Sequence, residues 1–247
     1  MKNDIRGAER RYTEPMAKIY RTKNMLRKNA RRQVLSILFT WISYFMLLFL
    51  SELNIAGIGF FIAALYTMYA FRRHRIIRVG IRGEEEALSL VSEIGDDYAV
   101  FSNLKVEYEN KESETDLIVV GKKGVFVIEV KNHNGKIVGG EEDKTWKQHK
   151  IGKKGGRYTA DLYNPTKQVG THVWRLSKNL RDQNMRTWVQ GIVFFVNPEV
   201  TVEVQTKHTP VLTLDKPFLN YLENLQVEKE LDDELVRRII SYLKSHL

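Results

Sequence analysis

Three residues near the middle of the chain have types and spacing that suit chemistry on phosphate. Asp116 precedes an apolar run, and Glu129 and Lys131 stand two residues apart at the end of the next apolar run. Side chains alternate along a strand, so Glu129 and Lys131 point to the same face. Two carboxylates beside an ammonium group suit a hard divalent cation, which polarises a phosphate and acidifies a bound water. The pattern therefore indicates a metal-dependent phosphodiesterase.

A hairpin must bring these residues together. Residues 117–120 and 125–130 are strongly β-like, and the Gly121-Lys122-Lys123-Gly124 segment between them is a turn. Pairing that is symmetric about this turn predicts Asp116 opposite Glu129, with Cβ atoms roughly 4.5–5.5 Å apart. A shift of one residue would separate the two carboxylates.

Two adjacent carboxylates repel each other unless a cation lies between them. Asp116 and Glu129 are therefore candidate ligands of Mg²⁺ or Mn²⁺, and Lys131 is a candidate to orient the nucleophile or to stabilise charge on phosphate. The alternative is a solvated strand end, at which Lys131 merely offsets the two carboxylates.

The elements around this hairpin indicate an α/β domain that begins near Gly80. Asn164 is a good helix N-cap because Pro165 follows it at the first helical position. Periodicity and turn residues predict, in chain order, a helix over 83–94, a strand over 98–106, the hairpin above, a second hairpin over 136–138 and 145–149, a loop over 152–156, a helix from 164 to about 183, strands over 188–196 and 210–214, and a helix over 232–243.

Several short motifs along this segment occur in an order and spacing that are specific together. They are Gly80-x-x-Gly83-Glu84, Asn103-Leu104, Glu114 to Gly121, Gly124 to Asn132, Gly135-Lys136-Ile137, Trp146, and Asn164-Pro165-x-x-Gln168. In these motifs the chain from Gly80 to about Val196 resembles the nuclease-related domain (NERD) family of the PD-(D/E)XK nuclease superfamily.

The resemblance implies a restriction-endonuclease-like αβββαβ core with its site at the edge of the sheet. It implies that Asp116 and Glu129 bind the metal, that Lys131 is the catalytic lysine, that Glu84 is an auxiliary acid and that Gln168 is a polar helix residue facing the site. It implies no small-molecule cofactor, and it is compatible with a homodimer. Family likeness alone does not establish activity.

Two apolar runs precede this domain. Val34 to Leu50 and Ile55 to Phe71 are each 17 residues without a charge, and the four residues Ser51-Glu52-Leu53-Asn54 separate them. At about 1.5 Å per residue each run spans roughly 26 Å, close to the thickness of a bilayer core. A transmembrane hairpin is the natural solution, because lipid leaves backbone groups no outside partner. The alternative is a buried helical hairpin in a soluble core.

The charge distribution predicts the orientation of this hairpin. Residues 1–82 hold 16 Lys/Arg against 4 Asp/Glu, which leaves 23 Lys/Arg against 26 Asp/Glu for residues 83–247. The basic clusters flank the two runs, and the positive-inside rule therefore places both termini and the globular domain in the cytoplasm. The cluster residues, which are also suited to anionic headgroups of membrane lipids, are Arg27, Lys28, Arg31, Arg32, Arg72, Arg73, Arg75 and Arg78.

We therefore divide the chain into a basic segment (1–33), two transmembrane helices (34–50 and 55–71), a basic linker (72–82), a nuclease-like domain (83–200), and a C-terminal strand and helix (201–247) that complete or flank the domain. The chain has no cysteine, which excludes disulfides and thiolate zinc sites within it.

A basic loop region is the candidate surface for nucleic acid. Its cations stand near aromatic residues, a combination suited to phosphates and stacked bases, although an ordinary solvated loop fits the same residues. The candidates are Lys147, Lys150, Lys153, Lys154 and Arg157. His133, His149 and His172 lack metal-ligand spacing and are interpreted as structural or surface groups.

Two functions remain open at this stage. One is a membrane-anchored, Mg²⁺-dependent nuclease that acts on DNA or RNA at the cytoplasmic face. The other is a non-catalytic module that binds nucleic acid or protein, which the near-neutral charge of residues 83–247 favours slightly.

Overall fold

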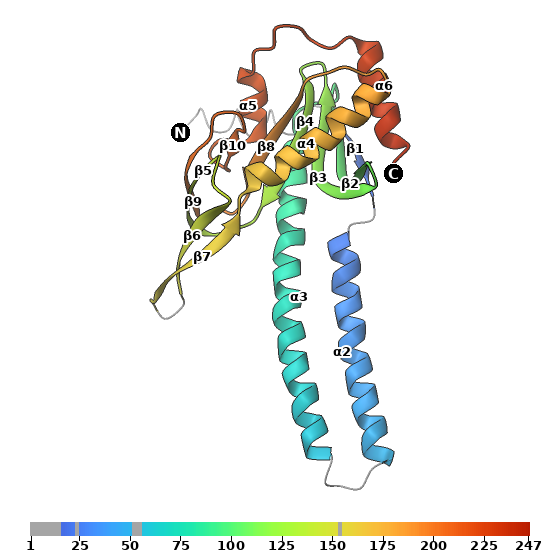
Figure 1. The fold of residues 1–247 in the computed structure, drawn as a ribbon, viewed down its shortest axis with the longest axis vertical. Coiled ribbons are helices and arrows are strands. Elements are labelled where there is room, and N and C mark those ends of the chain that lie inside the picture. The colour runs from blue at the N-terminus through green and yellow to red at the C-terminus, as the bar shows by residue number, and fades with distance from the viewer. Residues whose placement is uncertain (1–15, 23–24, 51–55, 153–154) are drawn as a thin grey trace, which may run out of the picture. The chain divides into compact units, whose positions relative to one another are not determined.

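The computed structural model describes residues 16–22, 25–50, 56–152 and 155–247. The chain divides into two compact units (Figure 1), one formed by Met1–Thr22 with Gly83–Leu247 and the other by Lys23–Arg82. We call them the globular unit and the helical unit. The expected polar turn at 51–54 lies outside the described residues.

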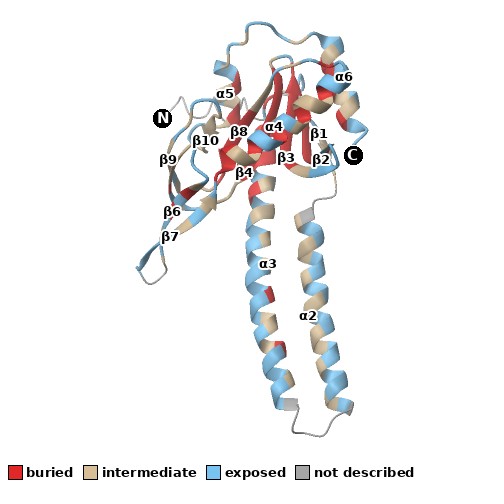
Figure 2. Ribbon diagram, in the orientation of Figure 1, coloured by how far each residue is buried: buried red, intermediate tan, exposed pale blue. Residues whose placement is uncertain are grey.

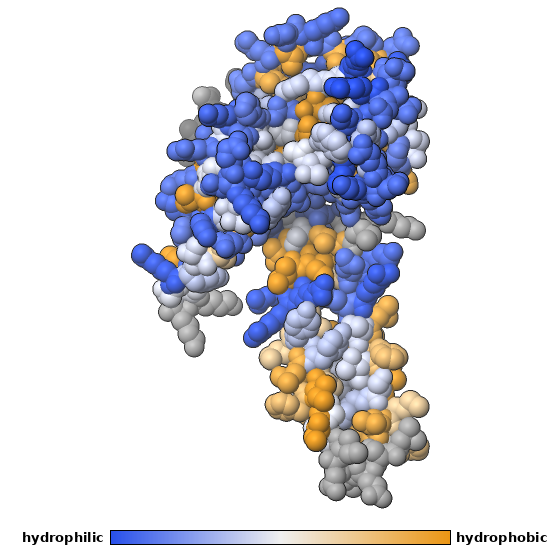
Figure 3. Space-filling view, in the orientation of Figure 1, coloured by the Kyte–Doolittle hydropathy of each residue, from blue (hydrophilic) through white to orange (hydrophobic). Residues whose placement is uncertain are grey.

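The helical unit consists of α2 (Met25–Leu50) and the first part of α3 (Ala56–Ser92). Its apolar side chains face outward, with Phe39 71% and Phe49 92% exposed, and Figure 3 shows apolar side chains gathered on its surface. Aromatic rings and polar groups join the two helices, and Trp41 and Tyr44 of α2 both contact Phe60 of α3. Trp41 Nε1 donates to Thr67 Oγ1 at 3.0 Å, and Tyr66 OH donates to a serine hydroxyl of α2 at 2.8 Å. Small polar contacts between helices with apolar outer faces are typical of membrane segments.

One helix within the described residues, Leu26–Phe49, is long and apolar enough to cross a membrane. It contains the first expected span, 34–50, except for its last residue. The second expected span begins at residue 55, which is not described, and its remainder, 56–71, is helical. The expected linker 72–82 is not a separate segment, because α3 continues through it to Ser92. No proline interrupts this stretch, and arginine and isoleucine are compatible with a helix.

The main sheet of the globular unit has six strands in the order β1-β2-β3-β4-β8-β10. Its strands are β1 (Lys18–Arg21), β2 (Ala99–Tyr108), β3 (Lys111–Gly121), β4 (Gly124–Lys131), β8 (Val189–Phe195) and β10 (Val211–Leu212). The predicted hairpin register is confirmed, since Val120 pairs with Val125 and Ile118 with Val127. Strand β1 was not predicted. It lies before the helical unit in the chain, yet it pairs in parallel with β2.

Helices cover both faces of this sheet in three layers (Figure 2). On one face, α4 (Pro165–Asp182) and α6 (Asp233–Lys244) pack through Leu176 and Ile239 against side chains such as Val127. On the other face, the end of α3 and the unpredicted α5 (Phe218–Asn224) pack through Val91 and Phe218. The mixed α/β class is confirmed, and strands β2, β3 and β4, helix α4 and strand β8 follow the expected order.

A second sheet of four strands, ordered β7-β6-β5-β9, extends this framework. Its strands are β5 (Gly135–Gly140), β6 (Thr145–Ile151), β7 (Arg157–Tyr163) and β9 (Val200–Gln205). The pairing of β5 with β6 confirms the second predicted hairpin. Strands β7 and β9 were not predicted, although Val200, Val202 and Val204 alternate with polar residues as a half-buried strand requires.

Asn164 joins the start of α4 to this second sheet. Its Oδ1 accepts a hydrogen bond from Thr166 N at 2.9 Å, which confirms the predicted N-cap. Its Nδ2 donates to the carbonyls of Gly140, Glu141 and Asp143 at 3.2, 3.0 and 2.7 Å, and the residue is fully buried. One side chain therefore fixes the helix start that carries part of the candidate site.

We predict that Asn164→Ala lowers the free energy of unfolding of the globular unit by about 2–3 kcal/mol, because a fully buried side chain that caps the helix N-terminus and bonds three part-buried carbonyls is lost. Thermal unfolding of the full chain in nonionic detergent, followed by circular dichroism, measures this. The matched control is Asp232→Ala, which removes the exposed N-cap of α6 with its single 2.7 Å bond to Leu235 N and should cost about 1 kcal/mol. Equal losses in the two variants would contradict the joining role of Asn164.

Candidate functional site

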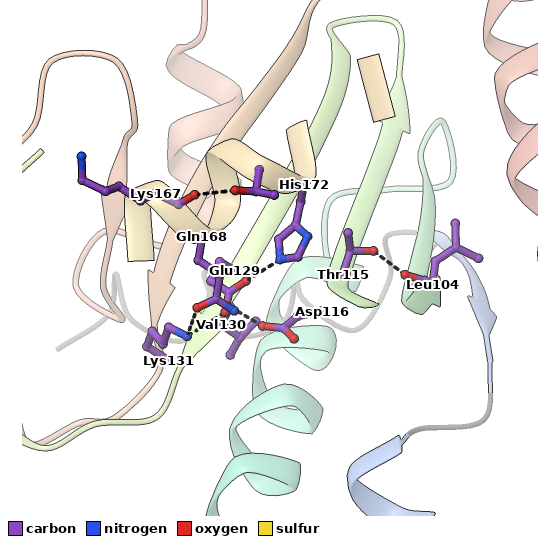
Figure 4. A network of polar contacts seen from close by, with 10 residues as sticks. Leu104, Thr115, Asp116, Glu129, Val130, Lys131, Lys167, Gln168 and His172 are labelled. Atoms are coloured by element: carbon purple, nitrogen blue, oxygen red, sulfur yellow. Dashed lines mark hydrogen bonds and ion pairs between the residues drawn. The ribbon is translucent and has the colours of Figure 1, made fainter. Parts of the chain in front are cut away.

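The site forms where the β3–β4 ladder ends. Leu117 and Ile128 are the last pair in register, so Asp116 and Glu129 occupy the next positions on the two strands. The carboxylate of Asp116 turns toward the backbone of β4, where its Oδ2 accepts from Val130 N at 2.7 Å (Figure 4). Asp116 and Glu129 are therefore neighbours, as expected. In addition, the Asp116 carboxylate accepts the Val130 N–H in place of a strand carbonyl where the β3–β4 ladder ends.

Lys131 joins β4 to α4. Its Nζ lies 2.7 Å from Glu129 Oε1 and donates to Gln168 Oε1 at 3.0 Å. Lys131 and Glu129 share a face of β4, as the alternation of side chains requires. Gln168 lies in the first turn of α4, which Asn164 holds in place. The structure therefore brings together four of the expected residues, Asp116, Glu129, Lys131 and Gln168.

His172 is a further member of the site that sequence reasoning assigned to structural or surface positions. Its Nε2 lies 3.5 Å from Glu129 Oε2, and its side chain is only 8% exposed. Neither ring nitrogen has a hydrogen-bond partner within the described residues. The signal was available, because residues four apart on a helix share a face, and Gln168 and His172 have this spacing.

Glu84 reaches the same region from α3. Its charge contributes to the raised pKa of the Asp116 carboxyl. The preceding glycine explains how the helix approaches so closely, because a Cβ on Gly83 would lie 2.6 Å from the Asn132 Cβ. Asn132 follows Lys131 directly, so Gly83 lets α3 pack against the end of β4.

The two carboxyl groups of the site are held in different states. Burial raises the pKa of Asp116 well above its ordinary range, and the charges of Glu129 and Glu84 raise it further against the opposing Val130 N–H and Lys131. Burial also acts to raise the pKa of Glu129, but His172 and Lys131 outweigh it and hold that pKa below its usual value. Unequal carboxyl pairs of this kind are typical of functional sites.

His133 adds a neutral group beside the lysine. Burial, and then the charges of Lys131 and Lys150, lower its pKa to about 4. The imidazole is therefore uncharged at neutral pH, and its environment is positively charged.

The residues fit a divalent cation. Asp116 and Glu129 offer hard oxygen ligands, and burial together with the charges of Glu129 and Glu84 raises the pKa of Asp116 despite the opposing charge of Lys131. Over the described ranges, no three or more histidine and acidic side chains form a complete ligand cluster. Magnesium sites commonly have so few protein ligands, because the ion binds one or two carboxylates and completes its coordination shell with waters and substrate phosphates.

The structure describes three of the five residues predicted to bind nucleic acid, namely Lys147, Lys150 and Arg157. Lys147 Nζ pairs with Asp161 Oδ1 at 2.5 Å across β6 and β7. Lys150 and Arg157 lie near the ends of these two strands. Lys153 and Lys154 lie outside the described residues.

We predict that Asp116→Asn stabilises the metal-free protein at neutral pH. A carboxyl with a raised native pKa holds its proton more tightly when folded, so stability falls as pH rises from the unfolded toward the native pKa. Asparagine removes that charge but retains an oxygen for Val130 N. In EDTA at pH 7.5 the variant should melt a few degrees higher, on the order of 1 kcal/mol, and the difference should shrink as pH falls.

Addition of Mg²⁺ or Mn²⁺ completes this measurement, because binding to the native state alone raises the melting temperature. The wild type should gain stability and Asp116→Asn should not. A variant that is less stable than the wild type in EDTA at pH 7.5 would contradict the charge imbalance.

Comparison with protein families identifies the central part of the chain. The model of the nuclease-related domain family (NERD) matches residues 79–196, which begin in α3, end just after β8 and include Glu84, Asp116, Glu129, Lys131 and Gln168. Comparisons with curated proteins and with solved structures give no match. The family match agrees with the motifs in the sequence. Residues 79–196 of this chain are similar to the nuclease-related domain family.

Proposed function

We propose that the globular unit is a divalent-metal-dependent nuclease that hydrolyses phosphodiester bonds of DNA or RNA. The observation that carries the proposal is the convergence of Asp116, Glu129, Lys131 and Gln168 at the end of the β3–β4 hairpin. An acid pair with a raised pKa on one member, beside an oriented ammonium group, suits the binding of a cation and a phosphate.

Each side chain has a role that follows from its position. Asp116 and Glu129 would hold Mg²⁺ or Mn²⁺, which when bound polarises the scissile phosphate and acidifies a water. Lys131 donates toward phosphate oxygen or orients the attacking water, and Gln168 fixes the direction of its Nζ. Glu84 is the auxiliary acid, whose charge acts on Asp116 from α3.

The burial of Glu129 gives this arrangement its rigidity. Glu129 is 3% exposed and its charge is compensated by Lys131 within the protein. A buried pair of this kind keeps its geometry because breaking it would leave an uncompensated charge. Pre-organised charge is what stabilises a developing transition state.

Cleavage assays with the full chain in nonionic detergent test the proposal. We expect labelled DNA or RNA to be cut in Mg²⁺ or Mn²⁺ and not in EDTA. Asp116→Asn and Lys131→Met should each lower the rate on the order of 100-fold or more. Lys105→Met is the matched control, because that lysine is exposed and pairs with Glu112 away from the site. Residual activity equal to the wild type in both site variants would attribute cutting to a contaminant and overturn the proposal.

A non-catalytic binding module is the second candidate, and one observation favours it. The donors and acceptors of Glu129, Lys131 and Gln168 satisfy one another, as they would in a purely structural cluster. Under this alternative, Asp116→Asn and Lys131→Met would leave the cellular effect of the protein unchanged.

We further propose that α2 and α3 form a two-span membrane anchor. Strand β1 precedes α2 and strand β2 follows α3, yet the two strands pair from Lys18 with Ala99 to Arg21 with Ser102. Both ends of the helical segment must therefore reach the same aqueous compartment. A single crossing by Leu26–Phe49 would separate β1 from β2, so 56–71 is the natural return span. The flanking arginines favour the cytoplasm as that compartment.

Cysteine labelling tests this topology, because the chain has no cysteine of its own. We predict that Ser51→Cys reacts with a membrane-impermeant maleimide in intact cells, since residue 51 lies between the two proposed spans. Ser241→Cys, an exposed position on α6, should react only after permeabilisation. Labelling of Ser241→Cys in intact cells, or protection of Ser51→Cys, would exclude the proposed orientation.

A further inference from the structure

A hollow at the C-terminal end of α4 is lined by two arginines and a tryptophan. It has a volume of about 550 Å³ and lies between the end of α4 and the start of β8. Its polar lining includes Ser177, Arg181, Arg186 and Thr187, and Trp188 forms one wall with 47% of its surface exposed. The combination of guanidinium groups, hydroxyls and an exposed indole suits a phosphate and a planar base.

The two arginine side chains of this hollow are not engaged by the described part of the protein. Neither guanidinium forms a hydrogen bond or an ion pair with another described residue. Arg186 also lines a neighbouring hollow of about 460 Å³ with Asp232 and Glu234. The negative charges of these two acids partly offset its positive charge. Arg181 lies on the other side, at the exposed end of α4, and faces no such acids in the hollow it lines.

The outer face of α4 leads from this hollow toward the candidate site. Lys167, Trp174, Lys178 and Arg181 follow one another at helical spacing on that face, where Trp174 and Arg181 are exposed and the two lysines are half-buried. Trp174 is 45% exposed, and Lys178 Nζ lies 6.0 Å from the centre of its ring. Arg181 lies 13 positions after Gln168 along the helix, which corresponds to a rise of roughly 20 Å.

We infer that α4 and this hollow form a binding surface for a single-stranded segment of nucleic acid. Arg181 and Arg186 contact its phosphates, and Trp188 stacks on an unpaired base. Lys178 and Trp174 contact the nucleic acid as it runs along α4 toward Lys131. The inference rests on the proposed nuclease function for its biological meaning, but binding at this surface is measurable without any cutting.

A single strand fits this surface better than a duplex. Exposed tryptophans stack on bases only where the bases are unpaired, and sequence-tolerant binding of single strands combines such stacking with a basic groove. Residues 83–247 have a slight excess of acidic over basic residues, so a local groove rather than overall charge has to attract the strand. Lys147 on β6 serves less well, because it is paired with Asp161 on β7.

Fluorescence anisotropy of a labelled 20-nucleotide single-stranded DNA and the matching RNA tests the inference. The full chain is used in nonionic detergent with EDTA, so that neither metal nor cleavage contributes. We expect Arg181→Glu combined with Arg186→Glu to weaken binding at least tenfold. The loss of two phosphate contacts should also reduce the slope of log K against log salt by about 1.4.

Three comparisons make the result specific. Lys105→Glu combined with Lys136→Glu makes the same charge change at two exposed lysines that do not line this hollow, and it should bind as the wild type does. Trp174→Ala should weaken binding several-fold without changing the salt slope, because it removes stacking and no charge. A polyglutamate peptide of matched charge should not displace the oligonucleotide.

Several outcomes would overturn the inference. They are absence of oligonucleotide binding by the wild type, unchanged binding by the arginine variant, an equal loss in the Lys105 and Lys136 variant, or displacement by polyglutamate. Unchanged melting temperatures ensure that a loss of binding is not a loss of folding. If the arginine variant loses binding while the wild type cuts nothing, the proposed catalysis fails and the surface stands. If the wild type cuts and the variant binds normally, the surface fails and the proposed catalysis stands.

Discussion

The register of the β3–β4 hairpin is the constraint on which the rest of the globular unit depends. Gly124 adopts φ +132 at the turn, a conformation that suits glycine, and it pairs with Gly121. A shift of one residue would exchange the faces of every following side chain. Val127 would then leave the core beneath α4, and Glu129 and Lys131 would turn away from that helix. The apolar core and the candidate site are therefore fixed by the same choice.

That register places the carboxyl groups of Asp116 and Glu129 in a buried environment. Lys131 compensates Glu129 closely, and Asp116 receives only a backbone N–H and more distant positive charge. The domain keeps this imbalance although an apolar or amide side chain would cost less, which is the usual relation between stability and a functional site. The unbonded nitrogens of His172 belong to the same pattern, because they are buried polar atoms beside Glu129 that the described protein leaves unsatisfied.

Strand β1 ties the chain before the helical unit to the sheet after it. Four residues from Lys18 to Arg21 pair with β2 and extend the sheet by one strand. A fragment that starts near residue 80 would lack this strand and expose the edge of β2, which is a site for unwanted pairing. The globular unit is therefore discontinuous in sequence, and the helical unit is an insertion within it.

The sequence by itself determined the features that depend on local geometry. The glycine turn and the alternation of side chains predicted the register of Asp116 and Glu129, and Asn164-Pro165 predicted the start of α4. Uncharged runs of 17 residues predicted the helices of the helical unit. Only the tertiary structure decided which distant segments meet: β1 with β2, β9 with β5, and His172 with Glu129. Short strands have weak local signals, and pairing between residues far apart depends on which surfaces the whole chain buries together.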